Sequence, residues 1–196
     1  MASRADILNA LRSRKLAPAE LPSLAGPWIT YADRQRQFSE TLQAVGGRCI
    51  EVAGEHSLRD ALAGLEPVKT AKKICSLVPG VLAPNVDLAA VADPHELEDV
   101  DVAVVPGHFA VAENAAVWVT DEHLRHRAIL FIVQHLVLVV PRDQVFDNMH
   151  QAYERLRFDG RGYGVFISGP SKTADIEQSL VIGAHGPRSL TVFLAG

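Results

Sequence analysis

The chain has 196 residues, of which 48% are hydrophobic and 21% charged, and this size and composition predict one folded domain with a compact core. Its net charge of −4 provides no attraction to phosphate backbones or anionic lipid, so a nucleic-acid partner is not expected. The most apolar run, residues 128–140, is too short to span a bilayer, and no signal-peptide pattern follows the basic N-terminus, so we expect a cytoplasmic protein with no membrane segment.

The first 45 residues are expected to form a helical N-terminal segment. Apolar residues recur there at helical spacing in two groups: Ile7, Leu8 and Leu11, then Phe38, Leu42 and Val45. Asp33 is placed to cap the second helix. A strand over residues 48–53 and a helix beginning at Ser57 should follow.

Apolar runs bounded by Pro, Gly or Asp predict further strands over residues 74–78, 102–105, 117–120, 129–140, 165–167 and 190–194. Several of these runs lack alternation with polar residues, which is typical of a largely parallel sheet covered on both faces by helices. Val145, Met149, Ala152 and Leu156 predict a helix of about four turns between two strands. The expected fold is a three-layer α/β domain with a mostly parallel sheet over residues 46–196, following the helical extension of residues 1–45.

The segment ISGPSKTADIE, residues 167–177, takes an apolar strand through a Gly-Pro turn toward an expected helix. The first N–H groups of such a helix, together with Lys172, could hold a small carboxylate or phosphate. The candidate ligand-binding residues are therefore Ser168, Gly169, Pro170, Ser171, Lys172, Thr173 and Asp175. Pro170 and Ser171 separate Gly169 from Lys172, so this is not a P-loop. The alternative is that the hydroxyls only cap the helix while Asp175 complements its dipole.

A second turn, His185-Gly186-Pro187, would place His185 at a loop mouth, and His185 and Gly186 complete the candidate ligand-binding set. Glu113 and His135 are the candidate catalytic residues. The alternative for Glu113 is a residue at a strand end that faces solvent. The alternative for His135 is a core histidine whose hydrogen bonds are made within the protein. On adjacent strands, the carboxylate could orient the imidazole for acid–base chemistry.

No metal or cofactor is expected from this sequence. Cys49 and Cys75 stand far apart, so they cannot build an iron–sulfur cluster or a zinc site. His123 and His126 have a spacing that two metal ligands can use, but the basic residues beside them favour a solvated loop.

Residues 167–194 closely resemble the C-terminal signature of the lactate-utilization protein C (LUD domain) family, SGPSxTADIExxLVxGxHGPxxL. Residues 108–119 resemble the family's second motif, in which an Ala-Glu pair precedes Thr-Gly-Thr. Glu113 matches this motif, whereas residues 114–116, Asn-Ala-Ala, depart from it. His135 matches a histidine that the family commonly carries in its long apolar strand.

The resemblance implies a fold like that of the sugar-phosphate isomerase and CoA-transferase (NagB/RpiA-like) group. It also implies a role in oxidising L-lactate to pyruvate, in which the family member works with two other proteins, one of them carrying iron–sulfur clusters. Because this chain has no cluster motif and no Gly-x-Gly-x-x-Gly loop, we expect an accessory or ligand-binding subunit whose partners are the iron–sulfur subunit and a second subunit. The alternatives are a free-standing enzyme or binder for an anionic sugar-phosphate or CoA-type substrate, and a purely structural domain. Homo-oligomerisation is left open.

Overall fold

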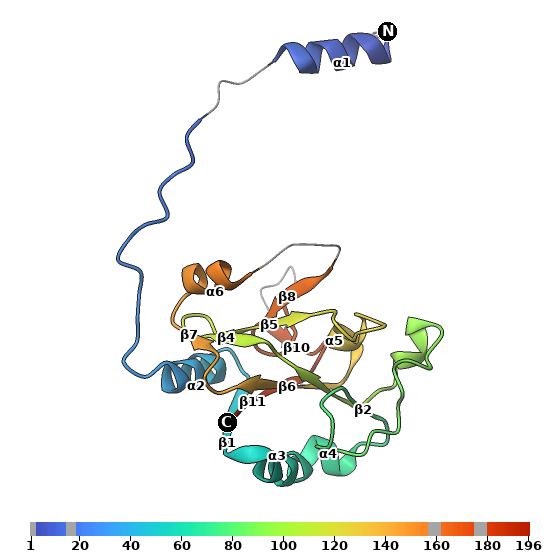
Figure 1. The fold of residues 1–196 in the computed structure, drawn as a ribbon. Coiled ribbons are helices and arrows are strands. Elements are labelled where there is room, and N and C mark those ends of the chain that lie inside the picture. The colour runs from blue at the N-terminus through green and yellow to red at the C-terminus, as the bar shows by residue number, and fades with distance from the viewer. Residues whose placement is uncertain (1–2, 15–18, 157–161, 175–179) are drawn as a thin grey trace.

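A five-stranded parallel sheet forms the centre of the computed structural model, which describes residues 3–14, 19–156, 162–174 and 180–196 (Figure 1). Its strands, in spatial order, are β1 (Arg48–Val52), β11 (Ser189–Ala195), β6 (His135–Pro141), β3 (Val102–Pro106) and β2 (Ile74–Ser76). Parallel strands buried on both faces have continuous apolar sequences, which is why β3 and β11 are recognisable in the sequence. The predicted α/β class with a mostly parallel sheet is confirmed.

Helices cover one face of this sheet. Two helices lie there, α3 (Gly54–Ala63) and α4 (Glu66–Thr70). The 3-10 turn η1 (Pro94–Leu97) belongs to the other face, because its Leu97 is buried in the same cluster as Leu136 and Leu138 of β6. Leu58 and Leu62 of α3 and Val68 of α4 pack against Val104 of β3 and Phe193 of β11 in one buried cluster.

The opposite face packs against a second sheet, which the sequence pattern did not predict as a separate layer. This sheet has the order β7 (Val145–Phe146), β4 (Phe109–Val111), β5 (Ala116–Thr120) and β8 (Gly164–Ile167). Two helices complete the layer, α2 (Arg34–Ala44) and α5 (Ile129–Ile132). Phe38 and Leu42 of α2 are fully buried in the same cluster as Leu136 and Leu138 of β6.

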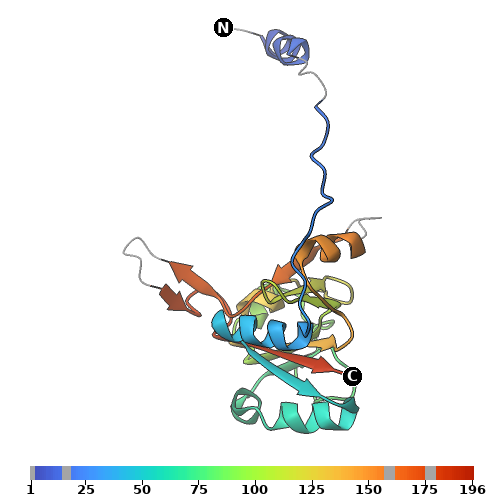
Figure 2. The ribbon, with the colours of Figure 1, turned by 90° about the vertical axis from the view of Figure 1, so that its left-hand side faces the viewer.

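The N-terminal segment contains the two helices that the sequence predicts. α1 (Arg4–Ser13) has no buried residue and stands apart from the rest of the chain (Figures 1 and 2). The second helix, α2, is capped as predicted, because the Asp33 carboxylate accepts the Arg36 N–H at 3.0 Å. No helix in the described ranges is long and apolar enough to cross a membrane.

Several local predictions are wrong. The helix expected from Ser57 begins at Gly54, a glycine in the left-handed region with φ +79°. The run of residues 129–140 is not one strand, because its first residues form α5 and only its second half joins the sheet. The helix predicted to have about four turns is shorter, α6 (Met149–Arg155), because Val145 lies in the strand β7.

The turn at Ser171 also does not lead into a helix. Residues 172–174 form β9 (Lys172–Ala174), which pairs antiparallel with β10 (Leu180–Ile182). The predicted helix N-terminus, with its anion-holding N–H groups, is therefore wrong. These two strands form a hairpin that projects from the body of the molecule (Figure 2).

Candidate functional site

The two C-terminal turns of the sequence meet at the base of the β9–β10 hairpin. The Ser171 N–H donates to the Pro187 carbonyl at 2.9 Å, and the Gly183 N–H donates to the Ser171 carbonyl at 2.9 Å. Gly186 lies so close to this junction that a Cβ would stand 2.9 Å from Ser171 Cβ and 3.1 Å from the Phe131 carbonyl oxygen. A side chain at position 186 would therefore force the two turns apart.

A cavity of about 210 Å³ lies between these turns, β8 and α5. It brings together six of the predicted ligand-binding residues: Ser168, Gly169, Pro170, Ser171, His185 and Gly186. Phe131, Leu136 and Phe166 supply apolar wall that the sequence did not predict. His185 is the one titratable side chain among the residues that line this cavity.

The remaining residues of the predicted set are elsewhere. Lys172 and Thr173 belong to β9 and do not line the cavity, and Asp175 lies outside the described residues. The Ser168 hydroxyl donates to the Asn114 carbonyl at 2.7 Å, so part of its hydrogen-bonding capacity is used inside the protein.

The cavity lies at the amino ends of the central strands, because Leu136 and Leu190, which line it, are the second residues of β6 and β11 and pair with each other. Small-molecule sites in open α/β sheets lie outside the carboxyl ends of the strands. The position of this cavity is therefore not that of a typical α/β active site.

Exposed apolar side chains lie at the cavity wall and on β10. Phe131 at its wall is 42% exposed, and Val181 and Ile182 of β10 are 43% and 50% exposed. Successive residues of a strand point to opposite faces, so the hairpin presents an apolar side chain on each side. A two-stranded hairpin is only marginally stable by itself in water, so a partner that packs against it would stabilise it. We use the name hairpin face for the cavity with Phe131 together with both sides of β10 at Val181 and Ile182.

Glu113 has a different setting from this face. It lies in the tight turn between β4 and β5, and its Oε1 accepts the N–H of Met149 at 2.9 Å, at the first turn of α6. The residues that depart from the family motif build this turn: Asn114 Oδ1 accepts the Ala116 N–H at 3.1 Å, and Ala115 has φ +55°. The carboxylate therefore holds a helix end.

His135 is the first residue of β6 and is half-buried. Its Nδ1 lies 2.7 Å from the Ser189 hydroxyl on the neighbouring strand. Burial lowers the pKa of His135, the nearby Arg188 lowers it further, and Asp101 opposes the change, so the imidazole is neutral at pH 7. Within the described part of the chain, no contact joins this histidine to Glu113.

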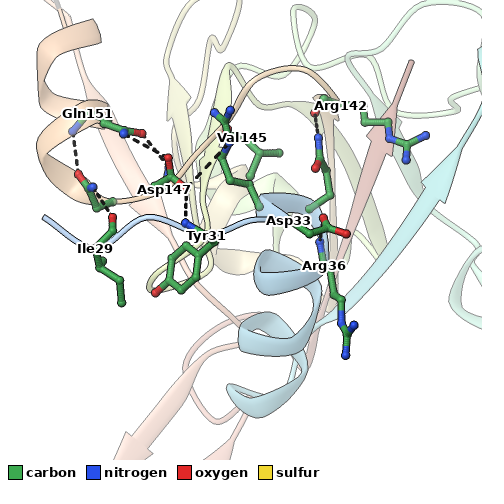
Figure 3. A network of polar contacts seen from close by, with 11 residues as sticks. Ile29, Tyr31, Asp33, Arg36, Arg142, Val145, Asp147 and Gln151 are labelled. Atoms are coloured by element: carbon green, nitrogen blue, oxygen red, sulfur yellow. Dashed lines mark hydrogen bonds and ion pairs between the residues drawn. The ribbon is translucent and has the colours of Figure 1, made fainter.

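A buried polar network that the sequence analysis missed ties the N-terminal segment to the start of α6 (Figure 3). Asp147 Oδ1 accepts the Tyr31 N–H at 2.9 Å, and Asn148 Nδ2 donates to the Ile29 carbonyl at 2.7 Å. Asn148 is also the N-cap of α6, accepting the Gln151 N–H at 3.0 Å. An Asn before a helical run is a known cap signal, and it could have revealed half of this network.

The histidines and thiols considered as metal ligands have other settings. His126 Nε2 lies 2.9 Å from the Val91 carbonyl, and His123 is exposed. Burial raises the pKa of Cys49 to about 11 and also raises that of Cys75. Among the described residues, no three His, Cys, Asp or Glu side chains are grouped so that they could hold a metal ion.

Comparison with known proteins gives three findings. The sequence model of the LUD domain family matches residues 68–195. Proteins named Lactate utilization protein C from Shouchella clausii and Geobacillus kaustophilus are 32% identical over 97 residues and 33% identical over 96 residues, or 47% and 46% of this chain. The matched stretch spans 42% and 40% of the length of those relatives. A crystal structure of a DUF162 family protein from Deinococcus radiodurans has the same fold, with a TM-score of 0.64 and 21% identity over 86% of this chain and 99% of that chain.

Proposed function

The chain belongs to the LUD domain family, and from that premise we propose that it is an accessory subunit of a system that oxidises L-lactate to pyruvate. The names of its relatives support a role in lactate utilization. The sequence supports an accessory rather than a redox role, because its two cysteines are far apart and it has no dinucleotide-binding glycine loop. Electron transfer is then carried out by an iron–sulfur partner, to which this chain docks.

The hairpin face is the observation that carries the proposal. Its cavity of about 210 Å³ has the volume of roughly seven water molecules and is walled mainly by apolar side chains. No Lys or Arg lines it, so a carboxylate enclosed there would have only His185 to offset its charge. Burying an unpaired charge is costly, whereas an apolar side chain of a partner protein would gain from burial. The face therefore suits protein docking better than it suits a bare organic acid.

The exposed strand of the hairpin adds to this argument. Val181 and Ile182 expose apolar area on both sides of β10, and fully burying one such side chain contributes about 1.5–3 kcal/mol. A partner that covers this hairpin would also supply the packing that two isolated strands lack. In this proposal the partner is the iron–sulfur subunit of the lactate system.

The test is reconstitution of lactate oxidation from purified components. Lactate-dependent reduction of a dye would be followed with the iron–sulfur subunit and the second subunit, with and without this chain. The proposal expects the rate to depend on the chain and to fall at least tenfold with the double variant Val181→Ser, Ile182→Ser. Leu24→Ser, at an exposed leucine away from the hairpin, serves as the matched control and should leave the rate unchanged.

Two outcomes would contradict the proposal. A rate that does not change when the chain is omitted would remove the accessory role. Lactate oxidation by the chain alone would instead support a free-standing enzyme.

A further inference from the structure

We propose that Ser189 and His135 form a nucleophile–base pair that hydrolyses a carboxylic ester. The Ser189 hydroxyl lies 2.7 Å from His135 Nδ1, and Ser189 also lines a cavity of about 500 Å³. A serine hydroxyl within hydrogen-bond reach of a histidine ring is the arrangement by which proteins activate a hydroxyl for nucleophilic attack. The inference goes beyond the docking role and does not depend on it.

The register of the central sheet places the two side chains side by side. Ser189 and His135 are the first residues of β11 and β6, and they pair with each other across these parallel strands. Every second residue of a strand points to the same face, and Val137 and Phe193, which share a face with the pair, pack against α3 and α4. The pair therefore lies on the face covered by helices, opposite the second sheet.

The cavity lies between this face and the loop that joins α3 to α4. Ile50, Ala61, Leu65 and Pro67 supply apolar wall. Its volume of about 500 Å³ equals that of roughly 17 water molecules, which is enough for a small ester with an apolar acyl group. The cavity is at the amino ends of the strands, so the proposal rests on the Ser–His pair and not on the usual place of sites in α/β sheets.

The imidazole is in the state that a general base requires. Burial lowers the pKa of His135 and Arg188 lowers it further, so the ring is neutral at pH 7 and can accept the proton of the serine. Asp101 opposes this change of the pKa, because its carboxylate favours the charged ring. The same carboxylate would stabilise the imidazolium that forms during attack.

Two donors at the cavity wall suit the negative charge that develops on the ester oxygen. Thr191 lies on the same face of β11 as Ser189 and pairs with Arg48 of β1, and both Thr191 and Arg48 line the cavity. A hydroxyl and a guanidinium can both donate to the oxyanion of a tetrahedral intermediate. Glu66 lines the cavity too, but its carboxylate lies 2.8 Å from Lys69 Nζ, which offsets its charge.

The reaction consumes one ester and one water and releases one acid and one alcohol. Ser189 Oγ attacks the carbonyl carbon while its proton passes to His135 Nδ1. The bond between that carbon and the alcohol oxygen then breaks, and the imidazolium returns the proton to the alcohol. Water, deprotonated by the same ring, attacks the acyl-serine and releases the carboxylic acid, which restores the hydroxyl and the neutral imidazole.

The experiment measures hydrolysis of p-nitrophenyl butyrate by the full chain, together with covalent labelling by a fluorophosphonate probe. Ser189→Ala should abolish labelling and lower the rate of hydrolysis at least hundredfold. His135→Gln should slow both reactions at least hundredfold, because the base is lost. Ser57→Ala, at an exposed serine of α3, is the matched control and should leave both reactions unchanged.

A measurement on the wild-type chain protects the test against loss of folding in the variants. Mass spectrometry of the labelled and digested protein should place the probe on Ser189. Labelling should also slow as the pH falls below 6.5, because a protonated His135 cannot accept the proton. Absence of labelling, a probe on another residue, or a rate of hydrolysis that Ser189→Ala leaves unchanged would overturn the proposal. These outcomes leave the docking role to be judged by its own assay.

Discussion

Replacing Asp147 with Ala should loosen the N-terminal segment from the domain. The carboxylate is buried, and it accepts the Tyr31 N–H at 2.9 Å and Gln151 Nε2 at 3.2 Å. A hydrogen bond to a charged group contributes about 1.5–3 kcal/mol. The ion pair with Arg34 is 3.9 Å long and half-exposed on the arginine side, so it adds little. We expect a loss of about 2 kcal/mol in the free energy of unfolding.

Thermal unfolding and hydrogen exchange together measure this effect. In a chain of this size, about 2 kcal/mol corresponds to a fall of about 4–8 °C in Tm. The Tyr31 amide should also lose protection from exchange, because its acceptor is gone. Asp147→Asn keeps an acceptor and should lose less than half as much stability. Asp143→Ala, at an exposed position of the same loop, should change Tm by no more than a degree or two. An unchanged Tm and unchanged Tyr31 protection in Asp147→Ala would refute the reasoning.

Three further predictions concern the residues chosen from the sequence. Glu113→Ala should lower the free energy of unfolding by about 1 kcal/mol, because the hydrogen bond to the Met149 N–H is lost. Glu113→Gln should keep both the stability and the activity of the lactate system. A Gln variant that is stable but inactive would show instead that the carboxylate is catalytic. Because the pKa of His135 lies below its ordinary 6.5, the unfolded chain binds the proton more tightly and stability falls as the pH drops below 6.5. His135→Gln should make the free energy of unfolding depend less on pH below 6.5. An unchanged pH dependence in this variant would argue against a lowered pKa of His135. Gly186→Ala should lower the free energy of unfolding by about 1–3 kcal/mol, because the added methyl group would crowd Ser171. A variant that unfolds at the same temperature as the wild-type protein would show that the two turns can move apart without loss of stability.

The central sheet was predictable because of how parallel strands are buried. The strands β3 and β11 are covered on both faces, so their sequences are continuous apolar runs with clear boundaries. The same reasoning failed at residues 129–132, where four apolar residues form α5. A short apolar run has no periodicity that separates a strand from a buried helical turn.

The hairpin was missed for a different reason. The segment from Ser168 to Thr173 carries hydroxyl residues that favour a helix start, but Lys172 and Thr173 pair with Ile182 and Val181 across the hairpin. That pairing is a contact between separate segments, which local preference does not encode. The meeting of residues 168–171 with residues 185–187 likewise depends on the paired strands of the hairpin, although the sequence analysis predicts each of these residues except Pro187 as a ligand-binding candidate.

Glu113 shows how a correctly chosen residue can have an unexpected setting. A carboxylate in an apolar stretch indicates a buried partner, and the sequence offered His135 for that role. The structure provides the Met149 N–H instead, 36 residues away in the chain. Only the packing of α6 beside the β4–β5 turn decides between the two.

Direct binding to the purified iron–sulfur subunit tests the docking account most closely. The dissociation constant would be measured by calorimetry for the wild-type chain, for the double variant Val181→Ser, Ile182→Ser, and for the control Leu24→Ser. All three proteins would first be shown to unfold at similar temperatures. The account predicts saturable binding that the double variant weakens at least tenfold and the control leaves intact. Binding of equal strength in all three proteins, or no binding by the wild-type chain, would contradict it.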